Sequence, residues 1–228
     1  MLGKLGKYLY AEFVGGRTRF DWGFMLSGIL VQIIVFSLQP DNPLAVVSGI
    51  AGIISVILCS QGKISTFLFG FVQITTYLIL CYEQRLYAEV GMNIFYFFSQ
   101  IYGIFVWLKH YRVTENKATL QPKHLALKAL LLVVFPIVIA ASALCGWLLA
   151  AFTDDTQPWL DAFTTVPAIA GQILMVLAYR EHWYFWLLID VLSIVMWINA
   201  ANWCMVAQYA FWCANCVYGY LYWNRQWN

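Results

Sequence analysis

Charged side chains are scarce in this sequence, and their scarcity decides its class. Asp, Glu, Lys and Arg make up 11% of its 228 residues, hydrophobic residues make up 62%, and the mean hydropathy is +0.71. An average soluble domain carries about 25% charged and about 45–50% apolar residues. The net charge is only +2, with no basic surface interleaved with aromatics, which excludes nucleic-acid binding. The composition predicts an integral membrane protein whose surroundings are the lipid bilayer.

Residues suited to chemistry are also few. The three histidines, His110, His124 and His182, fall in predicted loops. Cys213 and Cys216 have the CxxC spacing of a redox or metal pair, but no second pair or nearby histidine accompanies them. The sequence shows no nucleophile with an adjacent base and no glycine-rich phosphate loop. We therefore expect no catalytic residues, no metal site and no cofactor, and we expect that the protein is not an enzyme.

Long apolar runs, in contrast, fill most of the chain. A membrane-crossing helix needs about 20 mostly apolar residues. Polar or turn-forming breaks separate eight candidate runs: 22–38, 44–60, 64–82, 88–108, 125–151, 161–179, 183–200 and 204–223. These runs are too long and too continuously apolar for the strands of an outer-membrane barrel, which have about 10 residues. The prediction is an all-α integral membrane protein with eight transmembrane helices, preceded by an amphipathic or irregular lead-in rather than a signal peptide.

Basic residues divide unevenly between the two predicted faces of the membrane. If the loop at 109–124 is cytoplasmic, twelve of the 13 Lys and Arg residues lie on its side and only Arg85 lies on the other. Cytoplasmic loops of membrane proteins carry an excess of Lys and Arg. The distribution therefore predicts a multi-pass protein with both termini in the cytoplasm.

The second half of the chain repeats part of the first. A displacement of 116 residues aligns "YGIFVW" (102–107) with "YGYLYW" (218–223), and the same ungapped register pairs Phe69 with Phe185. We interpret this as two parallel three-helix repeats joined by a linker helix (3+1+3), with an extra N-terminal helix. The expected segments are the lead-in with the accessory helix (1–43), the first repeat (44–108), the cytoplasmic loop with the linker helix (109–160), the second repeat (161–223) and a cytoplasmic tail (224–228).

Polar side chains inside the predicted spans follow helical spacing. Trp183, Trp186 and Asp190 are three and four residues apart, so they share one face of the seventh span. A charge at the centre of a membrane helix costs about 2.5–3.5 kcal/mol on insertion scales, so Asp190 needs partners or water. Similar stripes on the third, fourth and eighth spans complete a predicted substrate-binding set: Gln73, Asn93, Tyr96, Gln100, Trp183, Trp186, Asp190, Trp212 and Asn215.

The residue types in this set suggest what the pocket holds. Indole faces attract flat rings and cations, and amides pair with hydroxyls and carboxamides. A flat, cationic ring joined to a polyol fits such walls, although a single amide such as Gln73 can equally serve to join two helices. Tryptophans at span ends are instead interpreted as residues of the interfacial belt, and Trp183 fits either interpretation. The belt set is Trp22, Trp107, Trp159, Trp203 and Trp223.

The C-terminal motifs resemble a known family. "EHWYFWLLIDVLSIVMW" (181–197) and "MVAQYAFWCANCVYGYLYW" (205–223) are similar to the signature of the PnuC family of nicotinamide riboside transporters, and "QRLYAEVGMNIFYFFSQIYGIFVW" (84–107) resembles its first-half counterpart. The resemblance extends over roughly residues 44–223. It implies a SWEET-like fold, a homotrimer in the bacterial cell inner membrane, and facilitated diffusion of nicotinamide riboside that a cytosolic riboside kinase traps by phosphorylation.

The resemblance also implies roles for individual residues. Trp183 and Trp186 would line or brace the pocket, and the amides Asn93, Gln100 and Asn215 would bind polar groups of the substrate. The family often has an amide or another polar residue at the position of Asp190, so the resemblance does not define whether Asp190 contacts the substrate.

Two other functions are compatible with the sequence. One is a carrier of the same fold for another vitamin, such as thiamine or riboflavin, or for a sugar. The other is a non-transporting membrane subunit, which would not bind a small polar ligand at micromolar concentration. A titration against several vitamins distinguishes these alternatives.

Overall fold

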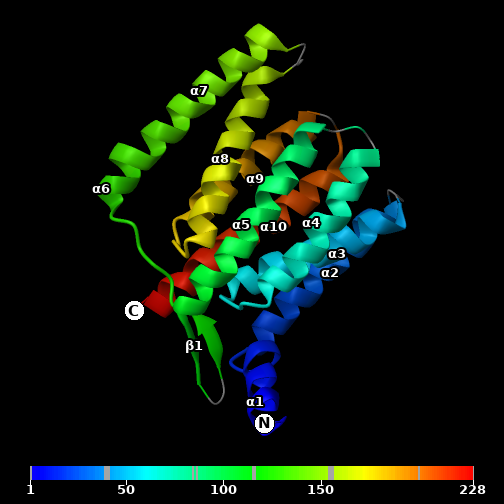
Figure 1. Ribbon diagram of the computed structural model, residues 1–228. Coiled ribbons are helices and arrows are strands. Elements are labelled where there is room, and N and C mark those ends of the chain that lie inside the picture. Colours follow the sequence, from blue (N-terminus) through cyan, green and yellow to red (C-terminus); the bar gives the residue numbers. More distant parts are fainter. Residues whose placement is uncertain are drawn as a thin grey trace.

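Helices build nearly all of the protein, as predicted. The computed structural model describes residues 2–38, 42–83, 85, 87–114, 117–153, 157–199 and 201–227. Figure 1 shows its helices, which in chain order are α1 (Leu2–Phe13), α2 (Arg19–Leu38), α3 (Pro43–Ser60), α4 (Thr66–Glu83), α5 (Tyr87–Lys109), α6 (Leu127–Ala129), the π-helical turn η1 (Leu130–Val134), α7 (Phe135–Phe152), α8 (Pro158–Val176), α9 (His182–Asn199) and α10 (Trp203–Trp227).

The predicted spans coincide with these helices to within about one turn. Within the described ranges, seven helices are long and apolar enough to cross a membrane, counting 127–152 as one. The remaining predicted span, 204–223, falls on α10, which is long enough at 25 residues but is not one of the seven. α10 is more polar because it carries residues such as Gln208 and Asn215 in its interior.

A small hairpin occupies the segment predicted as a cytoplasmic loop. Strands β1 (Tyr111–Val113) and β2 (Ala118–Leu120) pair antiparallel at one end of the bundle (Figure 1). Leu120 N donates to Gly62 O at 2.8 Å, in the turn between α3 and α4, and Lys123 N donates to Ala178 O at 2.7 Å, in the turn between α8 and α9. The end of β2 and the residues that follow it therefore join these two turns, a long-range pairing that helical spacing could not predict.

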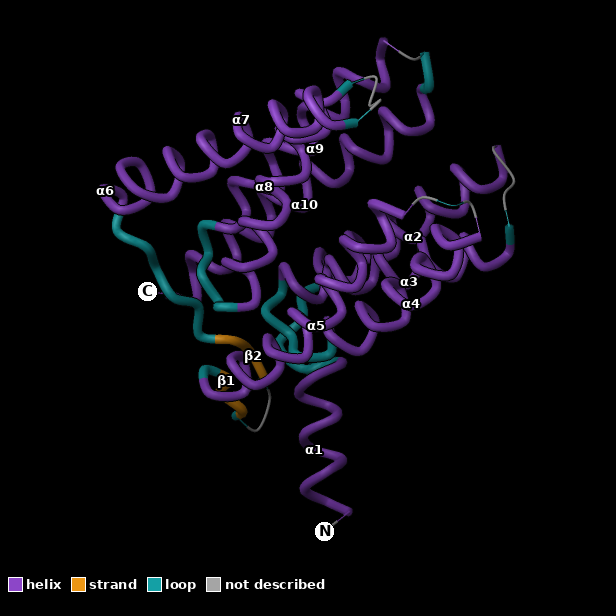
Figure 2. Tube along the Cα trace, turned by 45° about the horizontal axis from the view of Figure 1, so that its top comes forward, coloured by secondary structure: helices purple, strands orange, loops and turns teal. Residues whose placement is uncertain are grey.

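The membrane-length helices form two similar groups. α4 packs against both α3 and α5, and α9 packs against both α8 and α10. The groups meet through α3 with α10 and through α5 with α8, while α2 covers α3 and α10, and α7 lies against α8 (Figures 1 and 2). We call α3–α5 the first half and α8–α10 the second half.

Contacts between the halves recur at a displacement of 116 residues. Trp107 Nε1 donates to Met175 O at 3.0 Å, and Trp223 Nε1 donates to Cys59 O at 2.9 Å. The last helix of each half thus donates to the first helix of the other half. The Trp107 ring also meets Phe67 edge-on, at a centroid distance of 5.0 Å, as the Trp223 ring meets Trp183 at 6.0 Å. Both pairs of contacts obey the sequence register that aligns the two halves.

The turns inside the halves also match. Gly62 N donates to Cys59 O and Ala178 N donates to Met175 O, both at 2.9 Å. Gly62 and Ala178 have φ values of 62° and 64°, and this left-handed conformation is unfavourable for a residue with a Cβ atom. Ala178 adopts it because the same backbone hydrogen bonds and complete burial hold the turn in place.

Two of the predicted belt tryptophans are not at the interface. Trp107 and Trp223 are 0% and 1% exposed, so the belt interpretation is wrong for them. Each lies near the end of its span in sequence, but its indole points between the halves and its N–H is bound to a carbonyl oxygen. Trp183 is also buried. His182, predicted in a loop, is the first residue of α9 and is fully buried, with Nδ1 2.7 Å from Tyr179 O.

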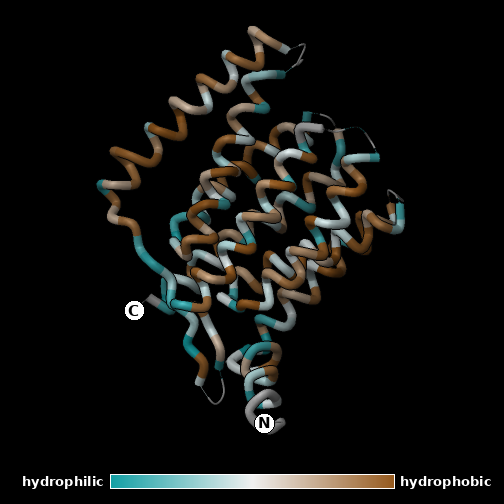
Figure 3. Tube along the Cα trace, in the orientation of Figure 1, coloured by the Kyte–Doolittle hydropathy of each residue, from teal (hydrophilic) through white to brown (hydrophobic). Residues whose placement is uncertain are grey.

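The outer surface of the bundle is apolar. Large hydrophobic side chains on α7, including Ile137, Leu144 and Phe152, are more than half exposed. Figure 3 shows hydrophobic residues along the helices, with hydrophilic ones frequent at the hairpin and near the ends of the bundle. Apolar surface of this extent is stable when lipid covers it.

Candidate functional site

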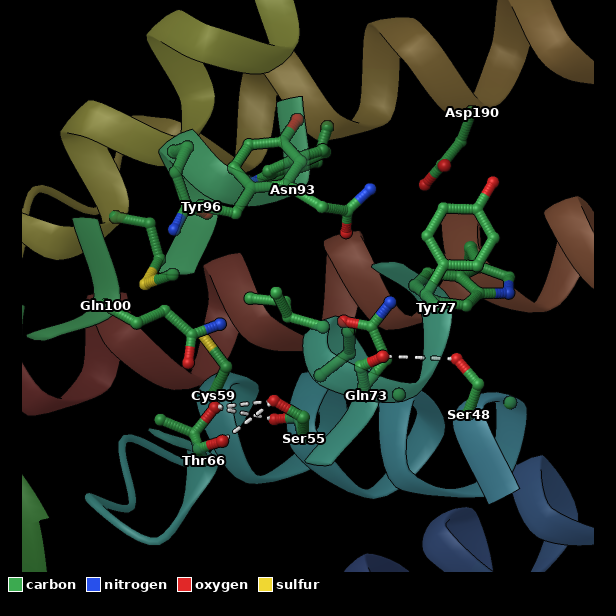
Figure 4. Close-up of a pocket in the computed structure, with 18 of the residues that line it drawn as sticks. Ser48, Ser55, Cys59, Thr66, Gln73, Tyr77, Asn93, Tyr96, Gln100 and Asp190 are labelled. Carbon is green, nitrogen blue, oxygen red and sulfur yellow. Dashed lines mark hydrogen bonds between the residues drawn. The ribbon is translucent and has the colours of Figure 1, made fainter. Parts of the chain in front are cut away.

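A cavity of about 570 Å³ lies between the two halves (Figure 4). Its size falls within the range of about 300–1,000 Å³ typical of small-molecule sites. Side chains reach it from α2, α3, α4 and α5 on one side and from α8, α9 and α10 on the other. The site is therefore shared between segments that are far apart in sequence.

The predicted substrate-binding residues largely converge on this cavity. Eight of the nine line it: Gln73, Asn93, Tyr96, Gln100, Trp183, Trp186, Asp190 and Trp212. Asn215 is 1% exposed and does not belong to the described lining, and neither its Oδ1 nor its Nδ2 has a hydrogen-bond partner among the described residues. The structure thus brings the set together, and substrate contact by its members stays a prediction.

Three amides, Gln73, Asn93 and Gln100, lie in the wall that the first half provides, among apolar and hydroxyl side chains. A Cβ atom at Gly70 would lie 2.6 Å from Gln100 Oε1, and one at Gly52 would lie 3.1 Å from Gln73 Cγ, so both glutamines occupy space that glycines leave open. Gln100 Oε1 is buried without a partner in the described structure. Asn93 Nδ2 donates to Glu89 O at 2.8 Å, which holds that amide against its own helix. This wall offers unused hydrogen-bonding capacity to a ligand.

The second half provides three indoles and a carboxylate, and also the amides Gln172 and Gln208. Trp183, Trp186 and Trp212 line the cavity together with Asp190, which is 5% exposed and accepts a hydrogen bond from Cys216 Sγ at 3.3 Å. The Nε1 atoms of Trp183 and Trp212 have no acceptor among the described residues. An indole wall beside a carboxylate suits a flat cationic group.

The charges around the cavity have one sign. Asp190 and Glu89 both line it, whereas none of its described lining residues is Lys or Arg. Carboxylates around a partly dehydrated space favour cations and repel anions. The described lining therefore offers no Lys or Arg side chain to an anionic solute.

Several lining residues escaped the sequence analysis. Gln32 was missed because α2 was treated as an accessory helix, and Glu89 because it lies in the first turn of α5. His182 was assigned to a loop. Gln172, whose Nε2 donates to Ser99 Oγ at 2.8 Å, is an amide in the interior of a predicted span, so the criterion that selected Gln73 would have found it.

A buried polar cluster closes the bundle beside the hairpin. Lys63 Nζ donates to Ala11 O at 2.8 Å and to Gly15 O at 3.3 Å. Glu12 accepts hydrogen bonds from Ser65 N, at 2.8 Å, and from the Tyr111 hydroxyl. Burial lowers the pKa of Lys63 to about 8, against the opposing influence of Glu12, and burial together with Glu12 raises the pKa of Tyr111. α1 is thus fixed to the turn between α3 and α4.

Apolar helices around a cavity with polar walls are the architecture of a membrane transporter for small organic solutes. The family model described as nicotinamide mononucleotide transporter matches residues 42–225. The nicotinamide riboside transporter PnuC of Neisseria mucosa is 33% identical over 94% of this chain and 84% of its own length. That of Haemophilus influenzae is 32% identical over 97% of this chain and 96% of its own length.

A solved structure agrees with the sequence comparisons. The crystal structure of the vitamin B3 transporter PnuC superposes with a TM-score of 0.80 at 32% identity, covering 100% of this chain and 98% of that one. The chain therefore belongs to the PnuC family of membrane transporters, and this family is not a family of enzymes.

Proposed function

We propose that this protein takes up nicotinamide riboside, a precursor of NAD, by facilitated diffusion. The observation that carries the proposal is a single cavity that is lined both by indoles and Asp190, from the second half, and by the amides Gln73, Asn93 and Gln100, from the first half. Nicotinamide riboside consists of a cationic pyridinium ring, a carboxamide and a ribose. The ring matches the indole wall, and the carboxamide and ribose match the amides.

The charge of the cavity favours the riboside over the mononucleotide named in the family description. A phosphate monoester adds a charge of about −1.5 to −2 at pH 7, and proteins bind it with Arg, Lys or helix N-termini. The described lining contains Glu89 and Asp190 and no basic side chain other than His182. Relatives named nicotinamide riboside transporters are consistent with this choice.

The residues would divide the work as follows. Trp186, Trp212 and Asp190 hold the ring, and Trp183 braces the indole wall. Gln73, Asn93, Tyr96 and Gln100 bind the polar groups of the substrate. Asn215 would act indirectly, because it is buried outside the described lining.

A binding titration tests the substrate. Purified protein should bind the riboside at micromolar concentration and more tightly than the mononucleotide, thiamine or riboflavin, as measured by calorimetry. Asp190→Asn should weaken riboside binding if the carboxylate faces the ring. Tighter binding of the mononucleotide, or of thiamine, would contradict the assignment.

The transport step needs no energy source beyond the substrate gradient. We infer that a cytosolic riboside kinase consumes the imported riboside by phosphorylation and so maintains net uptake. In liposomes, riboside uptake should equilibrate without a pH or sodium gradient. A strict requirement for either gradient would contradict facilitated diffusion.

We also propose eight membrane crossings in a 3+1+3 arrangement with an N-terminal helix, both termini in the cytoplasm, in the bacterial inner membrane. The contacts that recur after 116 residues support the two repeats, and the distribution of Lys and Arg supports the orientation. A cysteine introduced at Thr114 should react with a membrane-impermeant maleimide only after the membrane is opened. The family resemblance supports a homotrimer, which native mass spectrometry would detect.

A further inference from the structure

One lining residue of the cavity, Gln32, lies outside the region that the family model matches. α2 ends at Leu38, whereas the match begins at residue 42. Yet Gln32, in the interior of α2, lines the cavity together with Ser48 and Gly49 of α3. α2 therefore contributes a side chain to a site that is otherwise built by the two halves.

The Gln32 side chain can extend to the cavity because Gly49 of α3 has no side chain. A Cβ atom at Gly49 would lie 2.3 Å from Gln32 Nε2 and 2.7 Å from its Cδ, closer than such atoms approach one another. Glycine weakens a helix relative to alanine, so this position in α3 needs a packing reason, and the passage of the Gln32 amide supplies one. Gly52 with Gln73 and Gly70 with Gln100 show the same relation. Gln32 thus belongs to a set of three glutamines, each seated over a glycine.

The protein itself leaves the Gln32 amide partly unused. Its Oε1 atom is buried and has no hydrogen-bond partner among the described residues. A buried polar atom in this state requires a donor from water or from a ligand. One amide accepts through its oxygen and donates through its nitrogen, and two neighbouring hydroxyl groups both accept and donate.

We propose that Gln32 binds the ribose hydroxyls of the transported riboside and so makes α2 part of the specificity of the carrier. This proposal rests on the proposed function. The Gln32 amide lies on α2, outside the two repeats. It would bind the ribose, which is the part of the riboside that the indoles do not hold.

Calorimetry on the full-length protein tests the contact between Gln32 and the ribose. Two ligands are compared, nicotinamide riboside and its 2′,3′-dideoxy analogue, and the affinity for the analogue is measured by its competition with the riboside. Gln32→Ala should weaken riboside binding about 10-fold, as expected for a lost buried hydrogen bond. It should change the affinity for the analogue less than about 2-fold, because the analogue lacks the hydroxyls that the amide would bind. Ser27→Ala, at an exposed position of the same helix, is the matched control and should leave both affinities unchanged.

Gly49→Ala provides a second route to the same side chain. Its methyl group should displace Gln32, so riboside binding should weaken as in Gln32→Ala. The double variant should bind the riboside no more weakly than either single variant, because both substitutions remove the same interaction. Additive losses would contradict the proposal, because they would place the effects of Gly49 and Gln32 in separate interactions.

The outcomes separate this proposal from the function on which it rests. If the wild type and Gln32→Ala bind the riboside with equal affinity, the role of Gln32 is overturned. The assignment of the riboside as substrate is then unaffected. Equal weakening of both ligands would show a structural effect and overturn the contact with the ribose. A wild type that does not bind the riboside would overturn both.

Discussion

The two halves of the molecule share a skeleton but line different walls. Where the first half has Gly70 and Gln100, the second half has Trp186 and Cys216, 116 residues later. The residues that join the halves behave in the opposite way, because Trp107 and Trp223 make the same hydrogen bond to the same position of the other half. Interface positions make equivalent hydrogen bonds in both halves, while cavity positions carry different side chains, as expected if the two walls bind different parts of the proposed substrate.

The largest difference between the walls should appear at Trp186. Trp186→Ala removes an indole face that is worth about 2 kcal/mol or more to a desolvated cation, so the riboside dissociation constant should rise at least about 30-fold. Calorimetry measures it, with size-exclusion chromatography as a check on folding. Trp147→Ala, at an exposed position of α7, is the control. Equal affinities of the two variants would remove Trp186 from the site.

Alanine substitutions at equivalent glycines should lower the free energy of unfolding equally in both halves. A Cβ atom at Gly103 would lie 2.8 Å from Phe67 Cε1, and one at Gly219 would lie 2.4 Å from Trp183 Cζ2. Alanine at either glycine should lower the free energy of unfolding by about 1–3 kcal/mol through overpacking. Thermal denaturation in detergent measures this, and Gly91→Ala, which has nothing within 4 Å, is the control. A loss in only one half would break the equivalence.

The amide wall should contribute through single hydrogen bonds. Gln100→Ala should weaken riboside binding by about 1–3 kcal/mol if the substrate satisfies the Gln100 amide. Calorimetry against Gln226→Ala, a glutamine in the last turns of α10, gives the comparison. An unchanged affinity would mean that Gln100 only packs over Gly70.

The reciprocal indole hydrogen bonds should each be worth less. Trp107→Phe and Trp223→Phe keep an aromatic ring but lose the N–H, so each should lower the unfolding free energy by about 0.5–1.5 kcal/mol. The two losses should be similar, since the bonds to Met175 and Cys59 are equivalent. Chemical denaturation measures both variants beside Trp203→Phe, an exposed control. Clearly unequal losses would show that the halves are held differently.

The last expected effect is a dependence of stability on pH, at the turns that differ in charge. Lys63 in the first half corresponds to Tyr179 in the second, and burial lowers the pKa of Lys63 to about 8 from its model-compound value of 10.5. Between these values the unfolded chain holds a proton that the folded chain has released, so the contribution of Lys63 to stability should increase as pH rises. The stability of the wild type relative to Lys63→Met should show this slope between about pH 8 and pH 10.5. A difference independent of pH would exclude the shift.

The sequence determined the features that depend on local composition. Apolar length predicted the spans, because a helix in lipid must satisfy its own backbone hydrogen bonds. Spacing of three and four residues predicted the stripe of Trp183, Trp186 and Asp190, because side chains at that spacing share a helix face. The register of 116 residues predicted the equivalence of Trp107 and Trp223 that the reciprocal hydrogen bonds display.

Only the tertiary structure decided which side of each helix meets another. Trp107 and Trp223 are tryptophans near the ends of their spans, as interfacial residues often are. They are nevertheless buried, because the two halves close over them. Gln32 belongs to the helix that was predicted to be accessory, and it lines the cavity because Gly49 leaves an opening in α3. The physical reason is the same in both cases: burial and contact depend on the surface of a neighbouring helix, which the residues of one helix do not encode.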